Sequence, residues 1–261
     1  MLLPVTPGSA ELSVAKVLLV TGAGRGIGAA TARLAAQRGY AVCVNYKSRE
    51  DDARRVVAEI EASGGRALAV KADITSDDDV ARMFDACDRQ LGVPSGLVNN
   101  AGVVELQSRL EGIDTARLQR VFATNVFGAF ACAREAVRRM STKRGGEGGA
   151  IVNVSSAAAR LGSAGEYVDY AASKGAIETF TIGLAREVAE EGIRVNAVRP
   201  GFIYTEMHAS GGESGRVDRV KESVPMKRGG DADEVARAIL WLLSDEASFT
   251  TGAFVDVTGG R

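Results

Sequence analysis

The stretch KVLLVTGAGRGIG, residues 16–28, decides the fold of this 261-residue chain. Its first part, Lys16–Thr21, is an apolar run typical of a strand that is buried on both faces, as in a parallel sheet covered by helices. A glycine-rich turn follows and opens directly into an alanine-rich helix, Gly28–Gly39. A strand, a tight turn and a helix in this order predict the first unit of a layered α/β fold.

The same alternation of strand-like and helix-like segments continues to the C-terminus. The predicted strands are Lys16–Thr21, Ala41–Tyr46, Ala67–Ala72, Gly96–Asn100, Ala150–Val154, Ile193–Val198 and Ala253–Val257. The predicted helices are Gly28–Gly39, Glu50–Ser63, Ser76–Leu91, Ala116–Met140, Tyr167–Glu191 and Ala232–Ser244. This order predicts a doubly wound Rossmann fold, with a central seven-stranded parallel sheet and helices on both faces. Ligands of such sheets bind beyond the carboxyl ends of the strands.

Domain organisation follows from the length and from the absence of a linker. A chain of this size commonly forms one α/β domain, so we expect a single domain over residues 15–261. Residues 1–14 lack the features of a signal peptide and are expected to be a flexible lead-in. The glycine-containing segment 204–224 is the longest candidate loop, and loops of this length are usually functional.

Composition narrows the class of partner. The formal net charge is -1 with both signs interspersed, so we expect neither nucleic acid nor a membrane surface as a partner, but a small molecule. No apolar run is long enough to span a bilayer. Cys43, Cys87 and Cys132 are few and scattered, which indicates free thiols in a reducing cytoplasm.

The glycine-rich turn is a candidate dinucleotide site. Gly22, Gly26 and Gly28 match the spacing TGxxxGxG, which allows a tight turn and close approach of a pyrophosphate to the free N–H groups of a helix N-terminus. Arg25 and Ile27 of the same turn are expected to contact the cofactor. An ordinary tight turn is the alternative interpretation.

Residues after the second strand favour NADP(H) over NAD(H). An NAD enzyme usually has an acidic residue there for the ribose 2′-hydroxyl, whereas this chain has Asn45, followed by Lys47, Ser48 and Arg49. Together with Arg25, these side chains could neutralise and hydrogen-bond a 2′-phosphate. The alternative is that they are solvated surface charges.

Six motifs in a fixed order resemble the short-chain dehydrogenase/reductase family, in its standard-length, single-domain branch. The resemblance covers nearly the whole chain, from about residue 14 to residue 261. The motifs are TGAGRGIG (21–28), NNAG (99–102), Asn125, IVNVSS (151–156), YAASK (170–174) and RPG (199–201). The family implies an oxidoreductase that moves a hydride between a nicotinamide and a carbonyl or secondary alcohol.

The resemblance also implies cofactor contacts at the ends of later strands. Asp73 would contact the adenine, Asn99 would border the adenosine ribose, and a threonine hydroxyl would help to hold the carboxamide. The remaining implied contacts are Ile74, Ala101, Gly102, Pro200, Gly201, Ile203 and Thr205. The NNAG turn could equally serve mainly to shape the central sheet.

Tyr170 and Lys174 are the candidate proton-transferring pair. They are four residues apart, so on a helix they share one face. An ammonium beside a phenol favours the phenolate, and we therefore expect Lys174 to lower the pKa of Tyr170 toward neutrality. By resemblance, Lys174 would also reach the nicotinamide ribose.

Ser156 and Asn125 complete the expected catalytic set. By resemblance, the second serine of the IVNVSS strand holds the substrate oxygen, although Ser156 to Tyr170 is one residue longer than the commonest family spacing. Strict counting gives Ala157, which cannot donate, so we assign the extra residue to the loop near 160–168. Ser155 is expected to point to the opposite side of the strand. By resemblance, Asn125 helps to hold a water that links Lys174 to solvent, with a plain buried asparagine as the alternative.

Assembly, metal content and substrate are less constrained. The helices around Val126–Val137 and Ile177–Val188 have more apolar residues than one buried face requires, and family likeness then implies a homotetramer, unless the surplus is only alanine helix propensity. His208 is the only histidine, so no metal is expected. The chain resembles glucose-dehydrogenase-like and 3-oxoacyl-reductase-like members, but specificity would lie in segments 103–114 and 206–224.

A second function class stays open at this point. A dinucleotide-binding sensor or scaffold could keep the fold without turnover. Such proteins usually lose the tyrosine or the lysine of the active site, and this chain retains both Tyr170 and Lys174. An NADP-dependent enzyme is therefore the favoured interpretation.

Overall fold

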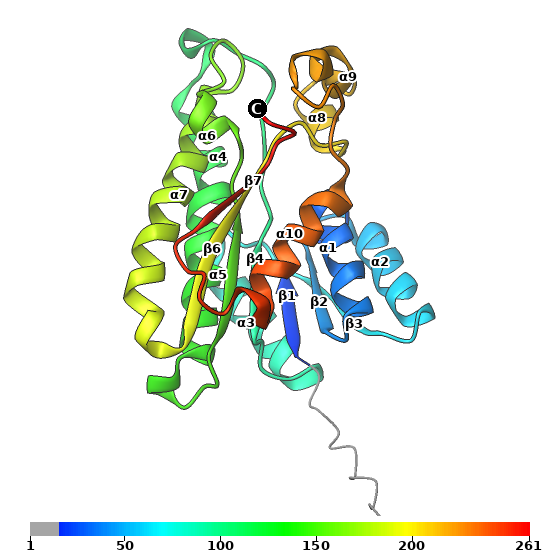
Figure 1. The fold of residues 1–261 in the computed structure, drawn as a ribbon, viewed down its shortest axis with the longest axis vertical. Coiled ribbons are helices and arrows are strands. Elements are labelled where there is room, and N and C mark those ends of the chain that lie inside the picture. Colours follow the sequence, from blue (N-terminus) through cyan, green and yellow to red (C-terminus); the bar gives the residue numbers. More distant parts are fainter. Residues whose placement is uncertain (1–15) are drawn as a thin grey trace, which may run out of the picture.

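Residues 16–261 are described by the computed structural model, and their centre is a seven-stranded, all-parallel sheet (Figure 1). The strand order is β3-β2-β1-β4-β5-β6-β7. The strands are β1 Val17–Val20, β2 Ala41–Tyr46, β3 Arg66–Lys71, β4 Gly96–Asn99, β5 Gly149–Val154, β6 Ile193–Pro200 and β7 Phe254–Val257. The predicted doubly wound fold is confirmed. The strand order reverses between β1 and β4, which places the expected ligand crevice at that point.

Helices cover both faces of the sheet. The longer ones are α1 Gly26–Gln37, α2 Glu50–Ala62, α3 Asp77–Gln90, α4 Thr115–Phe122, α5 Gly128–Met140, α7 Val168–Val188 and α10 Ala232–Leu243. Helices α1, α2 and α10 share one apolar core with the sheet, and α3, α5 and α7 share the other. Successive residues of a strand point to opposite faces, so Leu18 belongs to the first core and Leu19 to the second. This is why the strands are continuously apolar.

The predicted helix Ala116–Met140 is interrupted. It consists of α4, a π-helical turn over Ala123–Phe127, and α5. Single π-turns inside α-helices occur often at functional sites, and this turn contains Asn125. Gly128 follows it, and a Cβ at this position would lie 2.6 Å from Cδ1 of Ile74. The start of α5 can therefore pack directly against the segment that follows β3.

Segment 204–224 is not the irregular loop that we expected. It contains two short helices, α8 Met207–Ser210 and α9 Arg216–Val220, which lie beyond the carboxyl ends of the strands (Figure 1). Arg216 and Val217 of α9 are buried. The helices escaped prediction because each is too short to show a helical repeat of apolar residues, as is α6 Ala158–Leu161.

Two further expectations concern the N-terminal residues and membrane-spanning segments. The flexible lead-in expected at residues 1–14 lies outside the described residues. Within residues 16–261, no helix combines the length and the apolar character needed to cross a membrane.

Candidate active site

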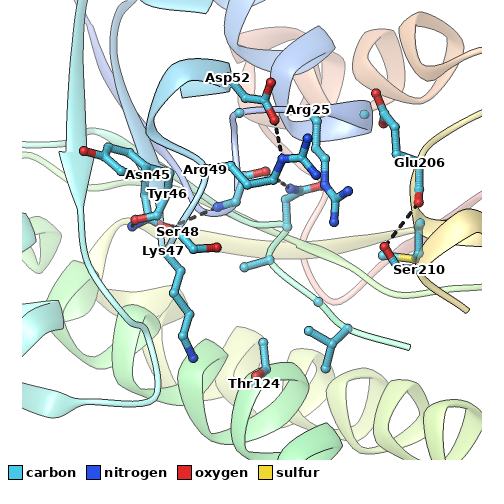
Figure 2. A pocket seen from close by; sticks show the side chains of 18 of the residues that line it. Arg25, Asn45, Tyr46, Lys47, Ser48, Arg49, Asp52, Thr124, Glu206 and Ser210 are labelled. Atoms are coloured by element: carbon cyan, nitrogen blue, oxygen red, sulfur yellow. Dashed lines mark hydrogen bonds and ion pairs between the residues drawn. The ribbon is translucent and has the colours of Figure 1, made fainter. Parts of the chain in front are cut away.

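A cavity of about 370 Å³ lies beyond the carboxyl ends of the strands, where the strand order reverses (Figure 2). Its volume falls in the range of small-molecule and cofactor pockets. The predicted cofactor residues that line it are Gly22, Arg25, Gly26, Ile27, Asn45, Lys47, Ser48, Asp73, Ile74, Ala101, Gly102 and Thr205. These predicted residues come from five separate segments of the chain.

The glycine-rich turn between β1 and α1 requires its glycines. Gly22 and Gly26 have φ angles of 62° and 54°, in the left-handed region that favours glycine. A Cβ on Gly22 would lie 3.0 Å from Cα of Ala101, and one on Gly28 would lie 2.5 Å from Nδ2 of Asn100. Gly28 does not line the cavity but lets α1 pack closely against the turn, so that Gly26 opens the helix at the cavity wall.

Two buried side chains hold this turn in place, and only one of them was singled out from the sequence. Asn45 accepts a hydrogen bond from N of Gly22 at 3.1 Å and donates one to O of Ala72 at 3.1 Å. Thr21 was missed: its hydroxyl oxygen accepts hydrogen bonds from N of Asn100 and N of Ala101, each at 3.0 Å. Asn45 therefore supports the cavity, and Thr21 ties the NNAG turn to the glycine-rich turn.

The cations at the end of β2 differ in how they are paired. Nζ of Lys47 forms an ion pair with Oδ2 of Asp73 at 2.7 Å, and Arg49 forms one with Asp52. No ion pair of Arg25 is found within residues 16–261. The ammonium of Lys47 points away from the guanidinium groups of Arg25 and Arg49 (Figure 2). Arg25 is therefore the cation in this cavity whose charge is not already neutralised.

Asp73 lines the cavity and places a carboxylate in its wall. Burial raises the pKa of this carboxyl, but hydrogen bonds from Lys47 and Thr75 outweigh burial and hold the pKa below its ordinary value. Oδ1 accepts from N of Thr75 at 3.0 Å and from its hydroxyl at 2.8 Å. Asp73 is therefore a fixed, ionised acceptor at the end of β3.

The side chain of Asn99, for which the resemblance implied a place beside the adenosine ribose, does not line the cavity. It points into the core, where Nδ2 donates to Oδ1 of Asn153 at 3.0 Å and to O of Ala129 at 3.2 Å. The neighbouring Asn100 lines the cavity instead. These contacts agree with the alternative that the NNAG turn shapes the central sheet, since Asn99 joins β4 to β5 and α5.

The turn after β6 reaches the cavity through Thr205, while Pro200, Gly201 and Ile203 do not line it. A Cβ on Gly201 would lie 2.9 Å from Cα of Thr258, so this residue packs against the chain end rather than against the cavity. The Ile203 side chain is buried, and its carbonyl oxygen lies 3.1 Å from Nε2 of His208. Burial, and next the charge of Arg216, lower the pKa of His208.

Tyr170 and Lys174 lie one turn apart on α7, and Ser156 follows the end of β5. Nζ of Lys174 donates to O of Val154 at 2.7 Å and lies 5.6 Å from the centre of the Tyr170 ring. The hydroxyl of Ser156 lies close enough to Tyr170 to lower the pKa of the phenol, and it accepts a hydrogen bond from N of Ala158 at 3.1 Å. The structure therefore places Ser156 beside Tyr170.

The pKa of Tyr170 differs from our expectation. Burial raises it, and the nearby Ser156 hydroxyl offsets only part of that rise. Lys174 does not supply the lowering that we predicted. Burial lowers the pKa of its ammonium to about 8, so Lys174 has lost its charge before the phenol of Tyr170 ionises. A phenol with a raised pKa is protonated at neutral pH and can act as a proton donor.

Asn125 connects the π-helical turn to both the cavity and α7. Its Oδ1 accepts from N of Val103 at 2.8 Å, and its Nδ2 donates to O of Val103 and to the hydroxyl of Ser173, each at 3.0 Å. A Cβ on Gly102 would lie 3.4 Å from Oδ1 of Asn125 and 3.5 Å from Nζ of Lys174. Gly102, which lines the cavity, thus lies next to both Asn125 and Lys174.

The buried ammonium of Lys174 should make stability depend on pH. Below pH 8, Lys174 is protonated in both the folded and the unfolded protein, so the buried charge lowers the free energy of unfolding by its full amount. Between pH 8 and 10.5, Lys174 is protonated only in the unfolded protein, and this destabilisation decreases as the pH rises. We expect Lys174→Met to raise the free energy of unfolding by about 2 kcal/mol near pH 7. Denaturant titrations at several pH values check this, and a gain that stays constant up to pH 10.5 contradicts it.

The known proteins to which this chain is similar are described as reductases or oxidoreductases. Residues 22–261 match the family model described as enoyl-(acyl carrier protein) reductase. The chain is 60% identical over 245 residues to the uncharacterized oxidoreductase YgfF of Escherichia coli, covering 94% of this chain and 99% of the relative.

Two solved structures have the same fold as this chain. A short-chain type dehydrogenase/reductase from Mycobacterium marinum superposes with a TM-score of 0.88 at 33% identity, covering 94% of each chain. A 3-ketoacyl-(acyl-carrier-protein) reductase from Brucella melitensis, complexed with NADH, superposes with a TM-score of 0.87 at 33% identity, covering 94% of this chain and 98% of the other.

Proposed function

This chain belongs to the short-chain dehydrogenase/reductase family of oxidoreductases, and on that premise we propose that it transfers a hydride between NADP(H) and a carbonyl or secondary alcohol. One observation carries the proposal. Lys174 lies beside Gly102 of the cavity wall, and Tyr170 lies beside Lys174 with Ser156 next to it, so this set of side chains adjoins, at Gly102, a cavity that a glycine-rich helix N-terminus also lines. A dinucleotide and a small carbonyl substrate would meet at that junction.

The residues present fit a nicotinamide dinucleotide. Gly22 and Gly26 leave room for a pyrophosphate at the N-terminus of α1, where free N–H groups attract an anion. Asp73 and Ile74 would border the adenine, and Thr205 would face the carboxamide. When bound, the nicotinamide would supply or accept the hydride. The Brucella melitensis neighbour with its NADH supports a cofactor of this class.

The side chains of this chain would handle the proton and the developing charge. In reduction, Tyr170 would donate its phenolic proton to the substrate oxygen, and in oxidation it would take the proton back. Ser156 would hydrogen-bond the same oxygen as charge develops. Lys174 would hold the nicotinamide ribose, and the contacts of Asn125 with Val103 and Ser173 would keep the π-helical turn beside the lysine. The raised pKa of Tyr170 suits the role of proton donor, and hence carbonyl reduction.

The preference for NADP(H) over NAD(H) rests on the residues after β2. Position 45 is an asparagine and not an acidic residue, and its side chain is buried and hydrogen-bonded to backbone groups. Arg25, Ser48 and Arg49 line the cavity there and could bind a 2′-phosphate. Arg49 would have to exchange Asp52 for the phosphate. Lys47 is already held by Asp73 and would contribute less.

We also propose a homotetramer, supported by an uncovered apolar surface. Phe127 and Phe130 are 64% and 46% exposed, and Phe130 stacks on Phe180 with 3.7 Å between ring centres. Large aromatic side chains exposed together on helices are typical of contacts between subunits. Light scattering of the purified protein would test the assembly.

The proposed function can be tested with purified protein in two steps. Calorimetric titration with NADPH and, separately, with NADH should show binding, with NADPH the tighter ligand. A carbonyl screen with the preferred cofactor should then give turnover, and 3-oxoacyl thioesters belong in it because of the Brucella melitensis neighbour. Equal or tighter NADH binding contradicts the NADP assignment. Binding without turnover of any carbonyl or alcohol favours the sensor or scaffold instead.

Glu206 should weaken the binding of either cofactor. Its Oε2 lies 3.7 Å from where a Cβ on Gly26 would stand, at the helix N-terminus that would receive the pyrophosphate. A carboxylate there repels a phosphate, so Glu206→Gln should tighten NADPH and NADH alike by about fivefold at low salt. Asp233→Asn, which removes an acid from the neighbouring cleft, is the matched control and should leave both dissociation constants unchanged. Looser or unchanged binding in Glu206→Gln contradicts this account.

A further inference from the structure

Three motifs of the sequence meet at one side chain, Glu178, which lies one turn after Lys174 on α7. The hydroxyl of Ser155 donates to Oε1 of Glu178 at 3.0 Å. From the other side, Nε of Arg199 donates to Oε1 at 2.6 Å, and Nη2 of Arg199 donates to Oε2 at 2.8 Å. The first serine of the Ser155–Ser156 pair, the catalytic helix and the arginine of the RPG turn are thereby joined.

These contacts are of the kind that fixes geometry. A guanidinium bound to a carboxylate through two parallel hydrogen bonds is short, strong and directional. The side chains of Arg199 and Glu178 are 14% and 15% exposed, and Ser155 is buried. Arg199 is further held over the ring of Phe254, 4.2 Å from its centre. The carboxylate of Glu178 consequently has little freedom to move.

Glu178 with its partners Ser155 and Arg199, which we call the clamp, lies next to the residues proposed to act on the substrate. Ser155 immediately precedes Ser156, and its hydroxyl also lies 3.5 Å from O of Lys174. Tying Ser155 to Glu178 therefore ties the end of β5 to the turn of α7 that carries Lys174 and Tyr170. The separation between the Ser156 hydroxyl and the Tyr170 phenol depends on this link, because the two groups come from different elements.

We propose that Glu178 is a positioning residue, which holds Ser155 and Arg199 so that Ser156 stays beside Tyr170. The inference rests on the proposed function, in which Ser156 and Tyr170 act on the substrate oxygen. Glu178 itself touches neither cofactor nor substrate. Small misplacements of reacting groups lower rates strongly, so a loosened clamp slows the chemical step without abolishing cofactor binding.

The test compares Glu178→Gln and the milder Ser155→Ala with a matched control, Asp256→Asn. Asp256 belongs to the same network, since its Oδ1 lies 3.4 Å from Nη1 of Arg199, but its shorter ion pair, at 2.8 Å, is with Arg160, and no hydrogen bond joins it to Ser155 within residues 16–261. We expect kcat to fall roughly tenfold in Glu178→Gln and less in Ser155→Ala, with KM for the cofactor unchanged. Asp256→Asn should keep the wild-type kcat.

A second readout separates positioning from mere stability and needs no substrate. The ultraviolet titration of each variant, minus that of the same variant carrying Tyr170→Phe, reports ionisation of Tyr170 alone. Because the nearby Ser156 hydroxyl lowers the pKa of Tyr170, loosening Ser156 should move that titration to higher pH in Glu178→Gln and in Ser155→Ala, but not in Asp256→Asn.

Two outcomes overturn the inference. One is a Tyr170 titration in the folded Glu178→Gln and Ser155→Ala proteins that matches the wild type. The other is a kcat that falls equally in Asp256→Asn, which would mean that the whole network acts only through stability. Failure of the proposed function has a different signature, because then the wild-type protein itself binds no dinucleotide or turns over no carbonyl.

Discussion

Tyr170→Phe is expected to lower carbonyl reduction by about 1000-fold while leaving cofactor binding within a factor of about two, since general acid catalysis supplies 10²–10⁴-fold. The change removes a single oxygen from a partly buried ring and leaves the packing of α7 in place. Without the phenol, neither Ser156 nor the buried Lys174, which is bound to O of Val154, can deliver a proton to the substrate oxygen as directly. The measurement is single-turnover oxidation of bound NADPH, alongside calorimetric titration of the cofactor.

Tyr167→Phe is the control for this prediction. Tyr167 is also buried, on the same stretch of chain, and its hydroxyl donates to O of Gly211 at 3.2 Å, but no lysine follows it at the fourth position. Its variant should keep most of the activity. Turnover in Tyr170→Phe at more than about a tenth of the wild-type rate would show that another group transfers the proton.

The double variant Arg25→Ala/Arg49→Ala should weaken NADPH binding by about 100-fold and leave NADH binding unchanged. Hydrogen bonds to charged groups contribute about 1.5–3 kcal/mol each, and Arg49 must first give up its ion pair with Asp52, so two lost contacts amount to about 2.7 kcal/mol. NADH lacks the 2′-phosphate that these two guanidinium groups would bind, so it serves as the internal reference. Calorimetric titration of both cofactors at fixed ionic strength measures the difference.

Lys47→Ala separates a specific phosphate site from a general loss of positive charge. Lys47 lines the same cavity, but its ammonium is held by Asp73 at 2.7 Å and points away from Arg25 and Arg49. We expect Lys47→Ala to change the free energy of NADPH binding by less than about a fifth of the change in the double variant. An equal loss in Lys47→Ala, or a parallel loss of NADH binding, would place the 2′-phosphate elsewhere.

Features that depend on neighbours along the chain were predictable. The order of strands and helices followed from apolar runs and their period, and the tight turn followed from Gly22 and Gly26, which the structure places at positive φ. Tyr170 and Lys174 share a helix face because they are four residues apart, whatever surrounds the helix. The family was identified from the same short motifs, and the match over residues 22–261 confirms it.

Features that depend on contacts between distant segments were not predictable. Asn99 and Asn100 are adjacent and chemically identical, yet only Asn100 lines the cavity, because the pleat of β4 and the packing of α5 turn Asn99 inward. Likewise, Lys47 and Arg25 are both basic residues near the same crevice. Only the tertiary structure places an acid against Lys47, and the ion pair with Asp73 decides how much of its charge is left for a ligand.

The sequence by itself determined the fold, the family and the candidate Ser156–Tyr170–Lys174 set, because these rest on local geometry and on motif order. The tertiary structure decided how those residues behave. Burial raises the pKa of Tyr170, although the spacing to Lys174 predicted the opposite, and Glu178 joins Ser155 to Arg199 across three elements. Desolvation and side-chain partnership are properties of the packed state, in which groups far apart in the chain exclude water from one another.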